Sequence, residues 1–156
     1  MVANTTPIFT LTPNTGEMNC LVSTAMAAAD AMDGTSSVGT AFALAFTAGA
    51  DGSRIDEITV RYAATNGSTA SGTSAASVIR LWLNNGSDNT TATNNQLLGE
   101  IAVPAQTVTA LSTQITQPQV LPIELNIPAG YRIYAGSTVA AGGSLAWQVS
   151  IAGGDY

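Results

Sequence analysis

Carboxylates are the side chains of this sequence that could do chemistry. Asp30, Asp33 and Asp51 occur in "DAMDG" and "ADGS", where their oxygens could bind calcium. Their spacing does not match an EF-hand, and Asp is also a common turn residue, so calcium binding and turn formation both stay open. A glycosidase needs two carboxyl groups about 5–9 Å apart. Asp56 and Glu57 are neighbours on a predicted strand and point to opposite faces, so they are not that pair.

Two residue types that carry much enzyme chemistry do not occur in the sequence, which has no histidine and no lysine. The lack of histidine removes the usual general base, the Ser-His-Asp triad and the commonest zinc ligand. The lack of lysine excludes Schiff-base chemistry and the phosphate-binding loop. Cys20 has no second cysteine for a disulfide and no histidine to activate it, so we expect a small core residue. Apart from the calcium binding left open above, the sequence predicts no enzymatic activity, no metal centre and no cofactor.

Charge is sparse and acidic. Charged residues make up 9% of the 156-residue chain, and ten carboxylates against four arginines give a net charge of -6. Soluble domains typically carry about 25% charged residues. Four arginines cannot neutralise a row of phosphates, so we expect no nucleic-acid binding. No apolar run is long enough to span a membrane and no signal-peptide pattern opens the chain, so we expect no membrane contact and synthesis in a cytoplasm.

Strict alternation of apolar and polar residues predicts strands. The runs "AFALAF" (41–46) and "EITVRY" (57–62) are separated by "TAGADGSR", a Gly- and Asp-rich loop that predicts a hairpin between them. The residues expected to face inward are Phe42, Leu44, Phe46, Ile58, Val60 and Tyr62.

Five further runs alternate in the same way: 77–83, 96–104, 120–127, 131–136 and 145–151. In "SVIRLWL" the inward face has Ile79, Leu81 and Leu83, and Trp82 lies on the other face. In "LAWQVSI" the buried face has Leu145, Trp147, Val149 and Ile151. Pro122 within one of them predicts an edge strand. The stretch "STAMAAADAMDG" (23–34) leaves a short helix and an irregular crossover loop both open.

The sequence therefore predicts an all-β fold, an antiparallel β-sandwich of about eight strands with at most one short helix around residues 23–33. Jelly roll is the preferred topology. We expect an extended N-terminal arm over residues 1–14 and a single sandwich domain over residues 15–156.

Aromatic rings on the polar side of their runs are the candidate binding residues. Trp82 and Tyr134 lie there, and Tyr156 lies at the end of the sequence. Such rings could stack on a sugar or fill a subunit interface, and the interface is favoured because aromatic residues and Arg are enriched there. Arg80 shares the face of Trp82 and could pair with a nearby Glu and cover the indole.

Two other regions are candidates for contacts between subunits. The arm has extended character because Pro7 and Pro13 disfavour a helix, and with Pro7 and Phe9 it could reach across to a neighbour. An uncharged sheet face would suit packing against copies of the same chain, because it costs little to desolvate. The residues expected on that face are Ala41, Ala43, Ala45, Ala146, Gln148 and Ser150.

The stretches "TAGADGSRIDEITVR", "IRLWLNNGSDNTTATNNQLLGEI" and "LNIPAGYRIYAGSTVAAGGSLAWQVSIAGGDY" resemble a family of small proteins of tailed bacteriophages. The resemblance covers residues 35–156 and includes the Asn-Asn-Gly turn, the Pro-Ala-Gly-Tyr turn and the closing Gly-Gly-Asp-Tyr. It carries no catalytic motif. Residues 23–34 depart from the pattern.

The resemblance implies a virion structural role, similar to that of capsid decoration (cement) proteins. Such a protein would lie on the capsid surface, bind the major capsid protein and associate with copies of itself as a homotrimer. A carbohydrate-binding or tail- or fibre-associated sandwich module is the alternative. Solvent-exposed rings at Trp82 or Tyr134 would favour glycan binding, whereas rings buried against another chain would favour decoration.

Overall fold

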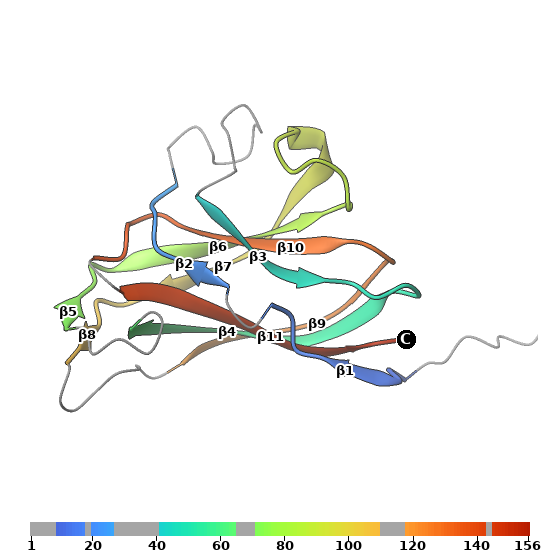
Figure 1. The fold of residues 1–156 in the computed structure, drawn as a ribbon, viewed down its shortest axis with the longest axis horizontal. Helices are drawn as coiled ribbons and strands as arrows, with labels where there is room; N and C mark the ends of the chain where they lie inside the picture. The colour runs from blue at the N-terminus through green and yellow to red at the C-terminus, as the bar shows by residue number, and fades with distance from the viewer. Residues whose placement is uncertain (1–8, 18–19, 27–40, 65–70, 110–117, 143–144) are drawn as a thin grey trace, which may run out of the picture.

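The computed structural model describes residues 9–17, 20–26, 41–64, 71–109, 118–142 and 145–156 (Figure 1). It is all-β, and its one helical element within those ranges is a 3-10 turn, η3 (Ala92–Asn94). The strands are β1 (Thr12–Asn14), β2 (Leu21–Val22), β3 (Phe42–Thr47), β4 (Ser53–Ala64), β5 (Gly72–Thr73), β6 (Ser77–Asn84), β7 (Asn95–Val103), β8 (Thr107–Val108), β9 (Gln119–Ile127), β10 (Arg132–Ser137) and β11 (Leu145–Asp155).

Two antiparallel sheets lie face to face (Figure 1). Sheet A has the order β1-β11-β4-β9, with β2 also paired to β11, and sheet B has the order β3-β10-β6-β7. The short strands β5 and β8 form a separate ladder. The predicted all-β antiparallel sandwich is confirmed.

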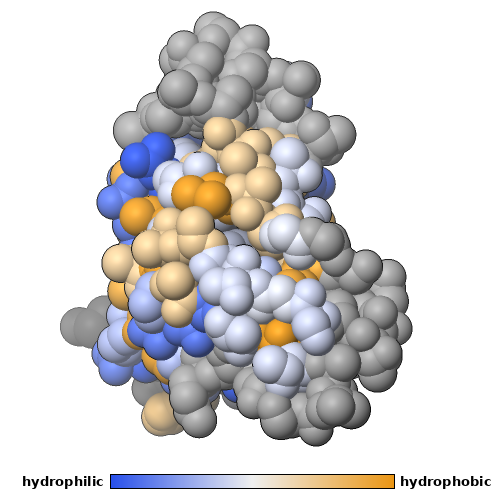
Figure 2. Space-filling view, turned by 90° about the vertical axis from the view of Figure 1, so that its left-hand side faces the viewer, coloured by the Kyte–Doolittle hydropathy of each residue, from blue (hydrophilic) through white to orange (hydrophobic). Residues whose placement is uncertain are grey.

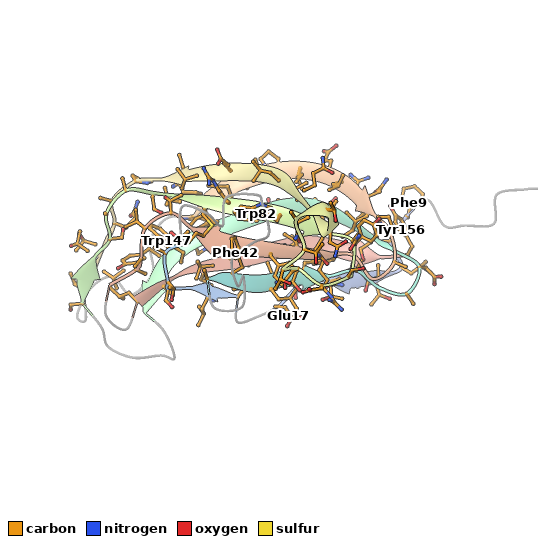
Figure 3. The ribbon with its side chains drawn as sticks, turned by 90° about the horizontal axis from the view of Figure 1, so that it is seen from above. Phe9, Glu17, Phe42, Trp82, Trp147 and Tyr156 are labelled. Carbon is orange, nitrogen blue, oxygen red and sulfur yellow. The ribbon has the colours of Figure 1, made fainter. Side chains whose placement is uncertain are left out.

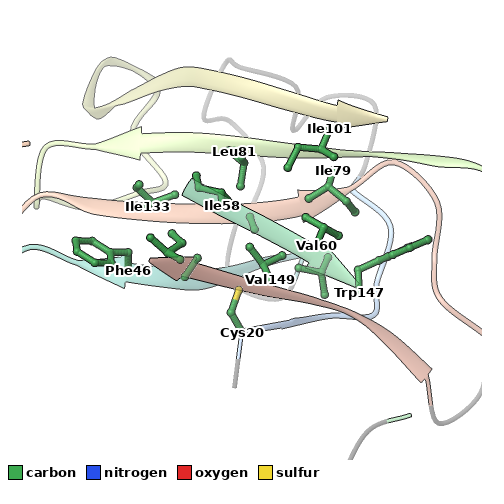
Figure 4. Packing of buried hydrophobic residues seen from close by; sticks show 14 of the residues in the cluster. Cys20, Phe46, Ile58, Val60, Ile79, Leu81, Ile101, Ile133, Trp147 and Val149 are labelled. Atoms are coloured by element: carbon green, nitrogen blue, oxygen red, sulfur yellow. The ribbon is translucent and has the colours of Figure 1, made fainter. Parts of the chain in front are cut away.

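The core lies between the two sheets and follows the alternation of the strands (Figure 4). Val60 on β4 pairs with Val149 on β11, and both side chains are buried against sheet B. Trp147 and Tyr62 also pair across these strands, with ring centroids 4.8 Å apart. The inward faces predicted for "EITVRY", "SVIRLWL" and "LAWQVSI" are therefore correct, because a period of two places alternate side chains on one face.

The hairpin predicted between residues 41–46 and 57–62 is wrong. β3 pairs with β10 in sheet B, whereas β4 pairs with β11 and β9 in sheet A. The loop between β3 and β4 therefore crosses from one sheet to the other. A strand with one apolar face shows the same alternation whether the next strand lies beside it or opposite it, so the pattern could not distinguish the two arrangements.

The common face predicted for Phe42, Leu44 and Phe46 is also wrong. In the β3–β10 ladder Ile133 pairs with Phe46, but the next residue, Tyr134, pairs with Leu44. This β-bulge leaves one extra residue on β3 and reverses the faces on either side of it. Phe46 consequently lies in the core, while Phe42 and Leu44 lie on the outer face of sheet B.

The exposed alanine face that the sequence suggested does not form. Ala41, Ala45 and Ala146 are buried, and Ala43 packs against the core. Gln148 and Ser150 remain partly exposed. A small side chain lets neighbouring segments approach closely, so a run of alanines is as consistent with tight packing as with an exposed surface.

The segment that was predicted as a helix or a loop is described only up to Met26. Residues 23–26 are not helical: Ala25 forms an isolated bridge with Ser137, whose carbonyl accepts a 2.8 Å hydrogen bond from the Met26 N–H. Residues 27–34 lie outside the described residues, and with them the calcium candidates Asp30 and Asp33.

The predicted turns and the edge strand are correct. β6 and β7 form a hairpin through Asn-Asn-Gly, where Gly86 has a φ of 88°. In the Pro-Ala-Gly-Tyr turn, the Tyr131 N–H donates to the Pro128 carbonyl over 3.2 Å, and Gly130 supplies the positive φ. β9, which contains Pro122, lies at the edge of sheet A.

Candidate interaction surface

Two large hydrophobic side chains of the arm are exposed. Phe9 is 77% and Leu11 70% exposed, and Val120 on β9, at 50%, is the other large hydrophobic side chain that is exposed in the described part of the chain. Phe9, one of the predicted interface residues, is thus exposed, and its role in an interface stays a prediction. Pro7 lies outside the described residues.

The arm is bonded to the sandwich where these side chains emerge. The Leu11 N–H donates to the Asp155 carbonyl over 2.8 Å, and Thr12–Asn14 form a ladder with the end of β11. Thr10 packs over Gly154, where an added Cβ would lie 2.7 Å from the Thr10 Cβ. Figure 3 shows Phe9 at the same end of the molecule as Tyr156. Phe9 and Leu11 are thus exposed on a segment held in place by backbone hydrogen bonds.

The Asp155 carboxylate ties this end of β11 to three other segments. It accepts hydrogen bonds from the Asn14 amide at 2.9 and 3.1 Å, from the Gly49 N–H at 3.3 Å and from the Ser53 hydroxyl. Burial raises the pKa of Asp155, but the hydrogen bonds from Ser53, Asn14 and Gly49 lower it, and the net pKa lies below the usual 3.8. The carboxylate is therefore ionised at neutral pH and stabilises the junction.

The residues around Asp155 give the closing Gly-Gly-Asp-Tyr a structural role. A Cβ on Gly153 would lie 2.2 Å from the Arg54 carbonyl oxygen, so only glycine fits at this bulge. The Tyr156 hydroxyl donates to the Asn126 side chain over 2.7 Å, and its N–H donates to the Gly52 carbonyl over 3.2 Å. Sequence reasoning noted this motif as part of a resemblance but missed its bonding.

Trp82 lies on the outer face of sheet B and is only 5% exposed. Its ring packs edge-on against Phe42, with centroids 4.7 Å apart, and its cross-strand neighbours are Tyr134 and Leu97. Tyr134 is half-buried. The indole therefore presents little surface to a sugar or to another chain.

Arg80 pairs with a glutamate, as the sequence suggested: its Nε donates to Glu100 Oε1 over 2.7 Å. Arg80, Trp82 and Tyr134 share the outer face of sheet B, whereas Phe9 lies beside β1 of sheet A. The predicted interface residues thus belong to two sheets and do not form one site.

The structure describes Cys20, Asp51 and Asp56, which the sequence analysis considered for chemistry. Among them, no three His, Cys, Asp or Glu side chains are grouped as a metal site would require. Cys20 is buried, and burial together with the charge of Glu17 raises the pKa of its thiol to about 12, so the thiol stays protonated at neutral pH. Asp56 is engaged by Arg54 over 2.7 Å, and Asp51 is exposed in the loop between β3 and β4.

Figure 2 views the molecule from the β5–β8 end, where much of the described surface has intermediate hydropathy, with separate hydrophobic (orange) and hydrophilic (blue) areas. No helix in the described ranges is long and apolar enough to cross a membrane. Comparison of the chain with protein-family models, with curated proteins and with solved structures found no match. Because Phe9 and Leu11 are the most exposed large hydrophobic side chains of the described residues, the arm that carries them is the candidate functional surface.

Proposed function

We propose that the protein is a non-enzymatic structural component of a tailed-bacteriophage virion, a decoration (cement) protein on the outside of the capsid shell. The observation that carries the proposal is the exposure of Phe9 and Leu11 on an arm bonded to a compact sandwich. Exposed apolar side chains on an ordered segment are typical of protein interaction sites. The resemblance of residues 35–156 to small phage proteins supplies the virion setting.

The distribution of charge supports a protein partner. Residues 9–16 carry no charge, while the whole chain has a net charge of -6. An uncharged arm is inexpensive to desolvate at an interface, and the acidic remainder disfavours nucleic acid. If each copy contacts several shell subunits, modest contacts combine because the later ones form at high effective concentration.

We also assign the sandwich to the jelly-roll topology, and the strand order supports this assignment. Apart from the short strands β2, β5 and β8, the described residues form eight strands, and these pair first with last: β1 with β11, β3 with β10, β4 with β9 and β6 with β7. Such pairing describes one long antiparallel hairpin rolled into two four-stranded sheets, as in a jelly roll.

The carbohydrate-binding alternative required an exposed ring at Trp82 or Tyr134. Trp82 is buried and Tyr134 is half-buried, and the hydroxyl of Tyr156 is already bonded to Asn126. This placement gives glycan binding no support, and we keep decoration as the proposal, with a tail or fibre location as the alternative within the same class.

The test is the protein composition of purified virions of the phage that encodes this chain. We expect the chain in a copy number proportional to that of the major capsid protein, and antibody labelling over the whole head. Absence from the virion would contradict the proposal. Labelling confined to the tail would reject the capsid location in favour of the alternative.

A further inference from the structure

We propose that copies of this chain associate head to tail, with Phe9 and Leu11 of one copy packing on the exposed side of β9 of the next. The contact joins two surfaces. The arm strip consists of Phe9, Leu11 and Pro13, and the β9 strip consists of Val120 and Pro122. All five side chains are exposed, and they include the three exposed large hydrophobic side chains of the described residues. Self-association in this way goes beyond shell binding and does not require a shell.

The two strips lie at opposite edges of sheet A and at different positions along its strands. β1 and β9 are the two outermost strands of that sheet. β4 lies between them. Asp155 pairs with Thr12 of the arm on one side and with Ser53 of β4 on the other. Val120 of β9 pairs with Thr59 of β4. Six residues of strand separate these positions, a distance of about 20 Å. One copy therefore cannot cover its β9 strip with its own arm strip.

The β9 strip faces away from the core because its strand alternates. Leu121, Ile123 and Leu125 pack against the core, so Val120 and Pro122 point outward. Pro122 lacks an N–H, and Glu124, with a φ of 45°, lies in a bulge that interrupts the pairing with β4. Both features oppose the addition of another strand along the free edge of β9. A partner is therefore expected to contact the side chains of the strip.

Charge favours the arm strip as the occupant of the β9 strip. Two carboxylates lie beside the β9 strip: Glu57 pairs with Pro122 across the strands, and Glu124 lies two residues after Pro122 on β9. Two β9 strips facing each other would bring these carboxylates together, which is unfavourable between chains of net charge -6. The arm strip has no charged residue between positions 9 and 16. Contact between two different surfaces is heterologous, and such contacts close into rings or continue as chains.

The experiment is sedimentation equilibrium of the full chain over a wide range of concentration. Two variants remove one strip each: Phe9→Ser with Leu11→Ser, and Val120→Ser. The control, Ala102→Ser, replaces an exposed apolar residue of β7 in sheet B. We expect the wild type and the control to associate as concentration rises, and each strip variant to remain monomeric.

A mixture of the two strip variants is the decisive measurement. Each variant keeps the strip that the other lacks, so an equal mixture should form dimers through one intact contact. Monomeric wild type at every concentration would overturn the proposal. Association of Val120→Ser equal to that of the wild type would overturn it too, because it would point to a contact between two arms.

The melting temperature of each variant separates loss of contact from loss of fold. If Val120→Ser does not fold, Val120→Thr, which keeps the shape and β-branching, replaces it, and dimers from its mixture with the arm variant are again required. The virion-composition experiment is independent of these results. A chain that is monomeric in solution but abundant on phage heads would contradict only the proposed self-association. A chain that associates in solution but is absent from virions would contradict only the proposed decoration role.

Discussion

The two tryptophans lie in different sheets, one on an inner and one on an outer face, and are nearly equally buried. Trp147 lies between the sheets at 2% exposure, against Tyr62. Trp82 lies on the outer face of sheet B at 5% exposure, against Phe42. Each packs against an aromatic ring at nearly the same centroid distance, 4.8 Å for Trp147 and 4.7 Å for Trp82, and both are labelled in Figure 3.

The difference between them shows what alternation does and does not predict. The pattern placed each tryptophan on the correct face of its strand. It predicted burial for Trp147 because that face meets the other sheet, and it left Trp82 available to a sugar or a subunit. Trp82 is buried nonetheless, so a face on the outside of a sheet is not always a face in solvent. Trp82 should therefore behave as a packing residue, as Trp147 does.

The largest effect is expected from Trp147→Ala. Removal of this ring leaves a cavity between the sheets, and we expect a loss of about 3–5 kcal/mol in the free energy of unfolding. Urea denaturation followed by circular dichroism measures it. A loss below about 1 kcal/mol would mean that the ring does not fill the core. Trp147 could then no longer serve as the buried reference for Trp82.

Trp82→Ala should cost nearly as much, about 2–4 kcal/mol, because an indole and its edge-on contact with Phe42 are both lost. The control is Trp82→Phe, which keeps an aromatic ring and should recover part of the loss. A change within about 0.5 kcal/mol, the usual limit for a surface substitution, would show that the ring is exposed. Interface and glycan roles for Trp82 would then be open again.

Asp155→Asn tests a polar anchor on the strand that carries Trp147. We expect a loss of about 1–3 kcal/mol at neutral pH, because an amide cannot replace a carboxylate that accepts hydrogen bonds from three segments. The folded-state pKa of Asp155 is lowered, so its stabilisation is complete above the unfolded pKa of about 4 and is lost as pH falls through the folded-state pKa. The difference in unfolding free energy between wild type and variant should therefore shrink in acid.

Guanidinium denaturation at a series of pH values measures this difference. Asp56→Asn is a control, since Asp56 is an exposed carboxylate whose ion pair with Arg54 lies on the surface. A gap between wild type and Asp155→Asn that stays constant with pH would show that the Asp155 carboxylate is not what holds the junction.

Much of the fold could be predicted, for physical reasons visible in single residues. The period of two fixed the faces of Ile58, Val60, Trp147 and Val149, because their alternate neighbours are polar or small. Pro122 marked an edge, and Gly86 and Gly130 marked turns that require a positive φ. The partner of each strand could not be predicted, since β3 shows the same pattern whether it pairs with β4 or packs opposite it. The bulge in β3, which turned Phe42 outward, left no trace in the alternation.

The candidate surface was predictable only in part. Phe9 was found because an extended segment with Pro7 and Pro13 lies before the first patterned strand. Leu11 and Val120 were not singled out, since exposure of one apolar side chain depends on what the rest of the fold covers. The bonding of Asp155 joins residues 141 positions apart, and no local pattern reports such a contact.

The smallest effect is expected from Arg80→Ala, on the same outer face as Trp82. Its ion pair with Glu100 is partly exposed, and such pairs contribute about 0–1 kcal/mol. If the Arg80 side chain also shields the indole, the variant should make Trp82 more accessible to acrylamide quenching in a Trp147→Phe background, with little change in stability. Glu100→Ala removes the same pair and leaves the Arg80 stem in place. Quenching that stays at the level of the Trp147→Phe parent in both variants would mean that other parts of the chain bury the indole. Trp82 would then resemble Trp147 still more closely.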